Sequence, residues 1–227
     1  MTATPTLDLD LSYRIGEAAF AALCERLRVI RPQVIVEFGA GASSIRLAQA
    51  FPEVSILSIE SDALYFDKER RMLAALPPLP NLRIEHRPLK WQRFRSGFFR
   101  TFGVGSFPEN IDVVIIDGPP YFTERGREAC LYQVARRIRV GGYIFLDDYE
   151  RPMERKIVEN WKSAYPGLGP FTVMPVGHQI ATARVNDHLG ASRFNLNAAL
   201  DNYAVLLRMA ARHARRMVRR AVGRDAG

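Results

Sequence analysis

A chain of 227 residues, 48% of them hydrophobic, is long enough for one α/β domain with small additions and can build a full core. No apolar run approaches the about 18 residues of a membrane-spanning helix, and we expect no signal peptide, because no charged-then-apolar segment opens the chain. Cys24 and Cys130 both lie in apolar helical patterns. They predict buried thiols in a reducing, cytoplasmic setting and exclude a disulfide framework.

The net charge of +8 is unevenly spread along the chain. Between Val205 and Gly227 there are seven arginines and one acid, Asp225, so this segment carries +6 and everything before it only +2. A basic segment favours contact with nucleic acid or with an anionic membrane surface. Because the charge is confined to one C-terminal segment, composition gives little support for nucleic-acid binding by the body of the chain.

The first half of the chain alternates between helical and strand patterns. In chain order we predict a helix over Arg14–Val29, a strand over Val34–Phe38, a helix over Ser43–Phe51, a strand over Val54–Ile59, a helix over Ala63–Leu76 and a strand over Leu82–His86. The aromatic-rich stretch Pro88–Asn110 is the least regular part, and we expect it to cover the functional site as a lid or wall.

The same alternation continues in the second half. There we predict a strand over Ile111–Ile116, a helix over Glu124–Arg139, a strand over Tyr143–Leu146, a helix over Met153–Ala164, a hairpin of Phe171–Val176 with Gln179–Val185, and a long helix over Asn195–Val222. Gly141-Gly142 is expected to end the Glu124–Arg139 helix as a C-cap. His178, in the hairpin turn, is expected to be exposed.

Strands that alternate with helices predict crossover connections and a parallel sheet. We therefore predict an α/β fold, a doubly wound and mostly parallel sheet with an antiparallel C-terminal hairpin at one edge. Residues 1–194 are expected to form this domain together with an N-terminal helix. Residues 195–227 are expected to form a basic amphipathic helix.

A glycine turn follows the first strand, in the run Glu37-Phe-Gly39-Ala-Gly41-Ala-Ser43-Ser44. Glycine lets the backbone approach a ligand closely, and free amides at the next helix start suit a carboxylate or phosphate. A dinucleotide site would need glycine where Ser44 stands. Ser43 and Ser44 can instead bind the carboxylate of S-adenosylmethionine (SAM), and Glu37 can accept from its ammonium. A tight turn without a ligand is the alternative.

An acid ends the second strand. Glu60 lies 19 residues after Gly41, and an acid at about that distance accepts both ribose hydroxyls in nucleotide-binding α/β folds. The alternative is a solvated helix cap, because Ser61 and Asp62 are also good cap residues. Together with the glycine turn, Glu60 favours a ribose contact.

Three further acids follow two strands of the predicted sheet. Asp117 ends the strand Ile111–Ile116 and precedes Gly118-Pro-Pro-Tyr121, while Asp147 and Asp148 follow the next strand. Three carboxylates at adjacent strand tips can bind Mg²⁺ or Ca²⁺, since like charges this close need a cation or a proton. Helix capping by Asp147 or Asp148, and a backbone contact by Asp117, is the alternative.

Together these motifs resemble class I SAM-dependent methyltransferases. Glu37-Phe-Gly-Ala-Gly41 is similar to their first motif, Glu60 to their ribose acid, and Asp117 and Gly141-Gly142 to later motifs. The resemblance runs from about Val34 to Val185 and implies SAM as the cofactor. It implies methyl transfer to a hydroxyl of a small molecule or glycan, or less readily to a nitrogen.

Two subgroups of that class share further positions with this chain. In catechol-type and macrolide-sugar O-methyltransferases, acids at the positions of Asp117, Asp147 and Asp148 hold Mg²⁺. This chain departs from both at the base, where Pro119 and Pro120 replace an expected lysine or acid. A poorly characterised bacterial subgroup is the closer match, through 82–89, 117–120 and 146–151 with Glu154 and Trp161.

Several other side chains are candidates for the acceptor site. His86, at a strand tip, is a candidate base or adenine contact, with a half-buried structural histidine as the alternative. Tyr121 is a candidate catalytic residue beside Asp117. Lys90, Arg151 and Glu154 could shape the acceptor pocket, and a structural role is the alternative for each.

Two other functions stay open on the sequence. Asp117-Gly-Pro-Pro-Tyr121 is superficially similar to the Asp-Pro-Pro-Tyr box of nucleic-acid amino-methyltransferases, but Gly118 interrupts the box. A methyltransferase-like binding module without activity is the second alternative, against which the complete cofactor motifs speak. For the basic C-terminal helix we expect packing on the body or on a partner subunit, as in a homodimer, or peripheral contact with an anionic membrane.

Overall fold

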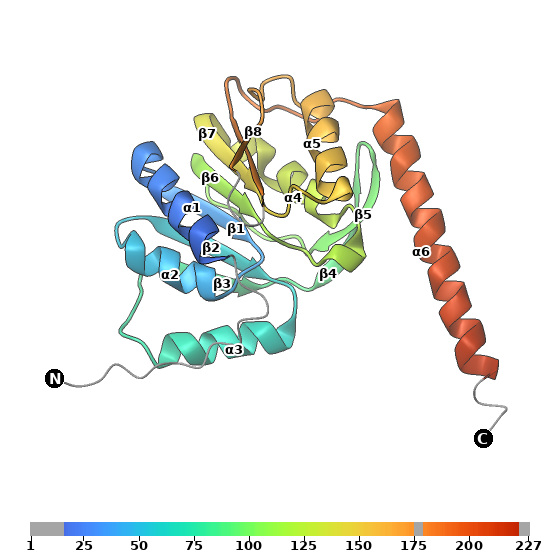
Figure 1. The fold of residues 1–227 in the computed structure, drawn as a ribbon, viewed down its shortest axis with the longest axis horizontal. Coiled ribbons are helices and arrows are strands. Elements are labelled where there is room, and N and C mark those ends of the chain that lie inside the picture. Colours follow the sequence, from blue (N-terminus) through green and yellow to red (C-terminus); the bar gives the residue numbers. More distant parts are fainter. Residues whose placement is uncertain (1–15, 175–178, 223–227) are drawn as a thin grey trace.

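A computed structural model gives the structure of the protein and describes residues 16–174 and 179–222 (Figure 1). Its centre is a seven-stranded sheet in the order β3-β2-β1-β6-β7-β9-β8. The strands are β1 (Val34–Phe38), β2 (Ser55–Glu60), β3 (Leu82–His86), β6 (Ile111–Ile116), β7 (Ile138–Leu146), β8 (Thr172–Met174) and β9 (Ile180–Arg184). Strands β3, β2, β1, β6 and β7 are parallel to one another, and β9 and β8 add the expected antiparallel hairpin.

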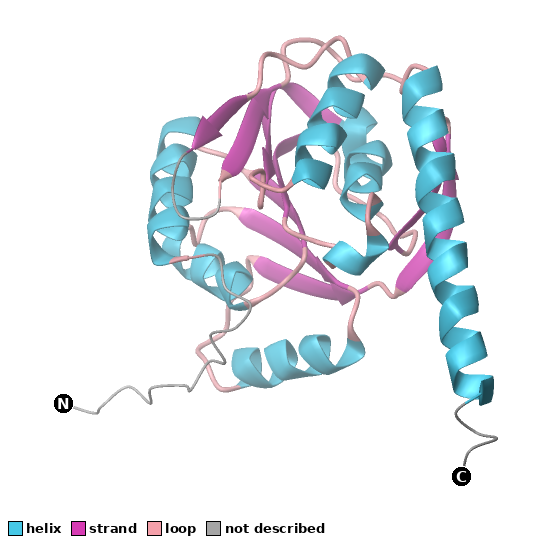
Figure 2. Cartoon of the chain, turned by 45° about the vertical axis from the view of Figure 1, so that its right-hand side comes forward, coloured by secondary structure: helices cyan, strands magenta, loops and turns pink. Residues whose placement is uncertain are grey.

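Helices cover both faces of this sheet, as Figures 1 and 2 show. They are α1 (Glu17–Ile30), α2 (Ala42–Ala50), α3 (Ala63–Ala74), α4 (Gly126–Val134) and α5 (Pro152–Ala164), whereas α6 (Leu196–Val222) lies outside these layers. Because strand side chains alternate between faces, each strand feeds two apolar cores. Ile35 and Val113 pack with α1 and α2 on one face, whereas Val36 and Val114 pack with α4 and α5 on the other. The doubly wound α/β prediction is confirmed.

The chain reverses its direction across the sheet at β1. From β1 it builds outward to β2 and β3, and it then returns to pair β6 with the free side of β1, in the register Phe38↔Ile116. In open α/β sheets, ligands bind in the crevice that such a reversal leaves at the carboxyl ends of the strands. The tips of β1, β2 and β6 therefore define where a site is to be sought.

The region around Gly141-Gly142 differs from the sequence prediction. Helix α4 ends at Val134, a short 3-10 turn follows over Ala135–Arg137, and β7 begins at Ile138, so both glycines lie within the strand instead of capping a helix. A Cβ on Gly142 would come within 3.0 Å of the carbonyl oxygens of Arg139 and Asp112. Close backbone approach, and not helix termination, explains that glycine.

The stretch 88–110 is also more regular than expected. It contains an antiparallel hairpin of β4 (Leu89–Phe94) and β5 (Gly97–Phe102), which forms a separate two-stranded sheet. Phe99 and Phe102 are buried, and the Phe102 ring lies 5.6 Å from that of Phe38 at the tip of β1. The aromatic residues of β5 thus anchor the hairpin to the core, although Trp91 stays half exposed.

Both cysteines are buried free thiols, as predicted. Burial raises the pKa of the Cys130 thiol to about 12, so it stays protonated at neutral pH. Within 16–174 and 179–222, none of the helices is both long enough and apolar enough to cross a membrane.

Candidate functional site

The tips of β1 and β6 are joined through backbone hydrogen bonds. The carbonyl of Phe38 accepts from the backbone N–H of Asp117 at 2.9 Å and from that of Gly118 at 2.7 Å. Gly39 follows with φ at +100°, and its N–H donates to the carbonyl of Ile59 on β2 at 2.9 Å. The turn therefore holds three strand tips together and leads into Gly41 at the start of α2.

Substitution of the two glycines should separate the structural and the ligand-binding parts of this turn. Gly39 has a left-handed backbone conformation, and a Cβ on it would lie 2.8 Å from the backbone nitrogen of Gly118. Gly39→Ala should therefore lower the free energy of unfolding by about 2 kcal/mol or more in urea titrations. Gly41→Ala meets only ordinary contacts, at 3.8 and 3.9 Å, and should change stability by less than about 0.5 kcal/mol. Equal losses in both variants would contradict this assignment.

Glu37 lies at the end of β1 and is almost fully buried. Its carboxylate accepts hydrogen bonds from the hydroxyls of Ser43 at 3.2 Å, Ser44 at 2.5 Å and Ser58 at 2.5 Å. Burial raises the pKa of Glu37, and the three hydroxyl donors oppose that rise. The acid is held in one orientation beneath the glycine turn.

The two serines face this acid. Ser44 is fully buried, and besides donating to Glu37, its oxygen accepts from the backbone N–H of Gly41 at 3.0 Å. A direct contact between the Ser44 hydroxyl and a cofactor carboxylate does not fit this burial, so we assign Ser44 to holding Glu37 and the turn. Ser43 is only half buried and lies at the rim of the same turn.

Glu60 lies at the end of β2, next to Gly39 and Ala40 through the carbonyl of Ile59. Its Oε1 accepts from the backbone N–H groups of Ser61 and Asp62, both at 2.6 Å. The cap of α3 is Asp62, whose carboxylate accepts from Leu64 at 2.8 Å. Glu60 is thus not needed as the helix cap, and its other oxygen, Oε2, accepts no hydrogen bond from the residues that the structure describes.

Glu69 on α3 brings a third carboxyl to this turn, which the sequence reasoning missed. It is 4% exposed, and its Oε1 lies 3.9 Å from where a Cβ on Gly41 would stand. Its Oε2 is buried without a hydrogen-bond partner in the described part of the chain. The available sequence signal for Glu69 was its spacing on the helix. It lies three residues after Phe66 and three before Met72, and both of these apolar residues are half buried.

The environment of Glu69 predicts a pH-dependent stability. Burial, with the charges of Glu60 and Glu37, raises the pKa of Glu69 to about 8, and Lys68 opposes this. The folded protein therefore keeps a proton on Glu69 up to about pH 8, whereas the unfolded chain loses it near pH 4.5. The contribution of this proton to the free energy of unfolding is fully present below pH 4.5 and is lost as the pH rises to about 8.

Glu69→Gln should remove most of this loss. Between pH 5 and pH 9 the free energy of unfolding of the wild-type protein should fall about 2–4 kcal/mol further than that of the variant. Urea titrations across this pH range measure the difference, with Glu53→Gln on the surface as the control. Parallel pH profiles of wild type and Glu69→Gln would contradict the burial of an ionisable acid here.

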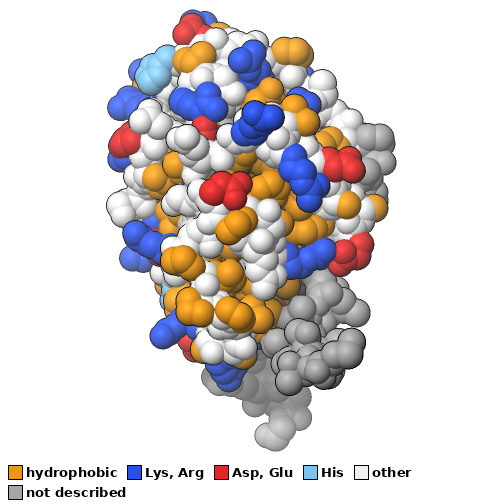
Figure 3. Space-filling model, turned by 90° about the vertical axis from the view of Figure 1, so that its left-hand side faces the viewer, with side chains coloured by type: hydrophobic (Ala, Val, Ile, Leu, Met, Phe, Trp, Pro, Cys, Tyr) orange, Lys and Arg blue, Asp and Glu red, His pale blue; other side chains and the backbone are white. Residues whose placement is uncertain are grey.

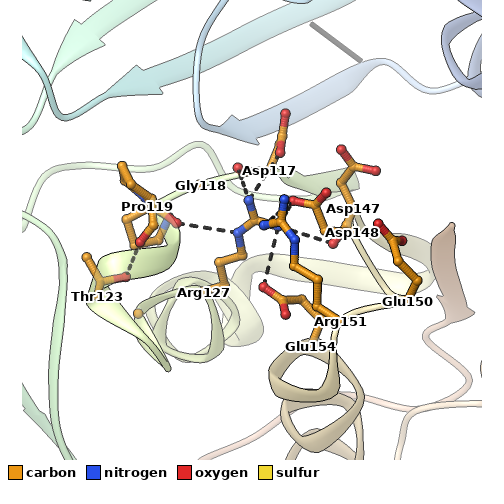
Figure 4. Close-up of polar contacts among 12 residues, drawn as sticks. Asp117, Gly118, Pro119, Thr123, Arg127, Asp147, Asp148, Glu150, Arg151 and Glu154 are labelled. Atoms are coloured by element: carbon orange, nitrogen blue, oxygen red, sulfur yellow. Dashed lines mark hydrogen bonds and ion pairs between the residues drawn. The ribbon is translucent and has the colours of Figure 1, made fainter. Parts of the chain in front are cut away.

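Asp117, Asp147 and Asp148 come together at the tips of β6 and β7. One oxygen of each lies within 4.8 Å of the others, as expected from their strand positions. Figure 4 shows that the guanidinium of Arg127, from α4, lies among them. Arg127 contacts Asp148 Oδ2 at 2.9 Å and Asp117 Oδ1 at 3.3 Å, and it donates to the Asp117 carbonyl at 2.7 Å. Sequence reasoning missed this buried cation.

A second guanidinium and a fourth carboxyl belong to this cluster. Arg151 contacts Asp148 at 2.7 Å, and Glu154 lies 3.7 Å from Arg127. Burial raises the pKa of Asp117 well above its ordinary value; Arg127 opposes this, and Asp147 and Asp148 add to it. Burial also raises the pKa of Glu154, which Arg127 opposes. The cluster therefore brings two guanidinium groups and four carboxyl groups together at the tips of β6 and β7.

This arrangement does not fit a bound Mg²⁺ well. Octahedral Mg²⁺ needs its oxygen ligands about 2.0–2.1 Å from the ion, whereas two of the three aspartates already form ion pairs with Arg127. A divalent ion between them would lie next to a guanidinium that is buried and cannot lose its charge. The donor set therefore favours Arg127 as the cation of this cluster.

His86 lies apart from this cluster. His86 ends β3, three strands from β6 in the sheet, where its Nε2 lies 3.2 Å from the Ser61 carbonyl oxygen and its ring stacks on Phe66. His86 is therefore not placed to act as a base beside Asp117, and its position suits a structural role or a contact with adenine.

Tyr121 is 77% exposed on a short 3-10 turn over Tyr121–Thr123, and Lys90 is exposed on β4. Arg151 and Glu154 are brought into the aspartate cluster by the start of α5. His178 lies outside the described residues.

A small pocket connects the two halves of the site. Glu37 and Ser43 from the turn line it together with Asp117 and Asp147, and apolar side chains of α1, α2 and β9 complete its wall. Figure 3 shows the side of the molecule where α1 and α2 lie in Figure 1; hydrophobic side chains gather at the centre of this face, and Lys and Arg side chains lie around them. Glu37 of the glycine turn and Asp117 and Asp147 of the aspartate cluster thus line one small cavity.

No family model matches the sequence, and no curated protein matches it. Many solved structures share the fold. An O-methyltransferase from Bacillus cereus in complex with SAH is 13% identical, with 76% of this chain and 83% of that chain covered and a TM-score of 0.57. TomG from Streptomyces achromogenes, an O-methyltransferase involved in tomaymycin synthesis and in complex with SAM, is 16% identical, with 77% and 82% covered and a TM-score of 0.54.

The SAH-bound methyltransferase of Podospora anserina is 11% identical, with 77% of this chain and 80% of that chain covered and a TM-score of 0.58. The chain therefore has the Rossmann-like fold of class I SAM-dependent methyltransferases, as the sequence motifs predicted. At these identities the likeness concerns the fold.

Proposed function

We propose that this protein is a SAM-dependent methyltransferase that acts on a hydroxyl of a small molecule or glycan. The observation that carries the proposal is the charge of the glycine turn. Glu37, Glu60 and Glu69 surround a backbone turn that, in dinucleotide-binding folds, holds a pyrophosphate. Glu37 and Glu60 disfavour a polyanion there and favour a ligand that carries a sulfonium and an ammonium, and Glu69 adds negative charge where a bound cation lowers its pKa.

Different residues then bind different parts of SAM. Glu60, whose Oε2 accepts no hydrogen bond from the described residues, is suited to accept from the ribose hydroxyls, and Glu37, buried below the turn, attracts the cationic end of the methionine moiety. The rim hydroxyl of Ser43 and the amides at the start of α2 are suited to the carboxylate. His86, beside Ser61 at the tip of β3, lies on the side of Glu60 that faces away from β1 and suits the adenine.

Asp117 is the residue that we place at the acceptor. When bound, SAM would supply an electrophilic methyl group to the acceptor oxygen and would leave as the neutral sulfide. The side chain of Asp117 is 37% exposed, and its raised pKa makes its carboxylate a better proton acceptor for the hydroxyl. Arg127 holds this carboxyl in place through the Asp117 carbonyl and Oδ1. Most of the catalysis is positioning.

The sequence also predicted a Mg²⁺ ion at the three aspartates. We propose that the Arg127 guanidinium is the cation there instead. The test is conversion of SAM to S-adenosylhomocysteine with a panel of catechol, sugar and oligonucleotide acceptors. We expect methylation of a hydroxyl acceptor at a rate that EDTA or added Mg²⁺ changes by less than about twofold. Loss of activity with EDTA and recovery with Mg²⁺ would contradict the role of Arg127, and methylation of the oligonucleotide alone would contradict the acceptor class.

A further inference from the structure

Helix α6 is anchored to the domain along one face of its N-terminal part. Ala198, Asn202 and Val205 are buried there. The Asn202 side chain exchanges two hydrogen bonds with the backbone of Phe98 on β5, at 2.8 and 3.0 Å, and the Ala198 carbonyl accepts from Arg125 at 2.8 Å. The C-terminal half extends away from the sheet in both ribbon views (Figures 1 and 2). The position of α6 on the domain is therefore defined by its first turns.

The opposite face of α6 carries a row of apolar side chains that nothing in the described chain covers. We call it the α6 apolar row, and it consists of Leu196, Leu200, Tyr203, Leu207, Ala210, Ala214 and Met217. Successive members are four or three residues apart, which places them on one side of a helix. Its large side chains are between 56% and 73% exposed. An apolar row of this length is uncommon on a surface that faces only water.

The arginines of α6 lie mainly on the side opposite this row. Arg208, Arg212, Arg215 and Arg216 are exposed, and Arg208, Arg212 and Arg216 follow the buried Val205 at steps of three, four and four residues. Arg208 and Arg212 share Glu124 of the domain. After Asp201, which pairs with Lys156 at 2.7 Å, the rest of α6 contains no acid. The helix therefore has a basic polar face opposite its apolar row.

We propose that α6 lies on an anionic membrane surface, with its apolar row at the boundary between headgroups and acyl chains and its basic polar face attracted to the surface charge. An apolar row opposite a basic, acid-free face is typical of helices that lie in a membrane interface. A second copy of the chain would also cover the row, but it would leave the positive charge of both copies uncompensated, because α6 contains no acid after Asp201. Anionic lipid offsets that charge, so charge complementarity favours the membrane.

Sedimentation of the full chain with vesicles tests this proposal. Vesicles of phosphatidylcholine mixed with phosphatidylglycerol should bind the protein at least about tenfold more tightly than phosphatidylcholine alone, and added salt should weaken the binding. Leu200→Ser combined with Leu207→Ser, and separately Arg215→Gln combined with Arg216→Gln, should each weaken it by about tenfold or more. Val104→Ser, at an 84% exposed apolar residue outside α6, should leave it unchanged.

Three outcomes would overturn the proposal. The first is equal binding to both kinds of vesicle, and the second is no binding to either. The third is a dimer in equilibrium sedimentation without lipid that the paired leucine substitutions convert to a monomer, since a second copy would then cover the row. Circular dichroism melts of each variant distinguish loss of binding from loss of folding.

Discussion

Arg127→Leu should lower the free energy of unfolding by about 3–5 kcal/mol, because it removes the buried cation of a charge cluster and its ion pairs with Asp117, Asp148 and Glu154. The side chain is 5% exposed and contacts carboxyl groups from both strand tips and from α5. It also donates to the carbonyls of Asp117 and Asp147, at 2.7 and 3.2 Å. Urea titration at neutral pH measures the loss.

Two further variants make this prediction specific. Arg151→Leu removes a guanidinium from the same Asp148, but its side chain is 42% exposed, so the expected loss is only about 0–1 kcal/mol. Arg127→Lys keeps the charge without the planar fork and should fall between the two. If Arg127→Leu were as stable as Arg151→Leu, the cluster would not depend on a buried cation, and the case for Arg127 in place of a metal would fail.

Glu60→Ala should weaken SAM binding by about tenfold to a hundredfold, because hydrogen bonds to a charged group contribute about 1.5–3 kcal/mol. The backbone bonds from Ser61 and Asp62 fix Oε1 at the strand tip, so little of the binding geometry has to form when the ligand arrives. Isothermal titration measures the ratio of dissociation constants.

The matched control is Glu53→Ala, which removes an exposed acid near the start of β2 and should leave the affinity unchanged. Because Asp62 and not Glu60 caps α3, the Glu60 variant should also keep its melting temperature within a few degrees. Full SAM affinity in Glu60→Ala would place the ribose elsewhere and contradict the assignment of this strand tip.

The sequence predicted the parts of the site that depend on strand order. Acids placed directly after apolar β-branched runs had to meet at one edge once the sheet was parallel, so Glu37, Glu60 and the three aspartates could be found from spacing alone. Arg127 and Glu69 could not, because each lies in a helix. Whether a helical charge points inward depends on how the helix packs, and neither residue follows a strand.

The same reason explains the errors in the elements. Gly141-Gly142 was interpreted as a helix end, yet the pairing of Ile111 with Ile138 extends β7 backwards through both glycines. The aromatic stretch lacked the alternation of a half-buried strand, since β5 places Phe98 and Phe99 on opposite faces and buries only one of them. Tertiary contacts decide both cases, and they are absent from a local pattern.

Parallel titrations of the full chain with SAM and with NAD⁺ test the central claim most directly. Acids around the glycine turn predict SAM binding with a dissociation constant on the order of micromolar and no detectable binding of NAD⁺. A folded protein that binds NAD⁺ and not SAM, or that binds neither, would contradict the account.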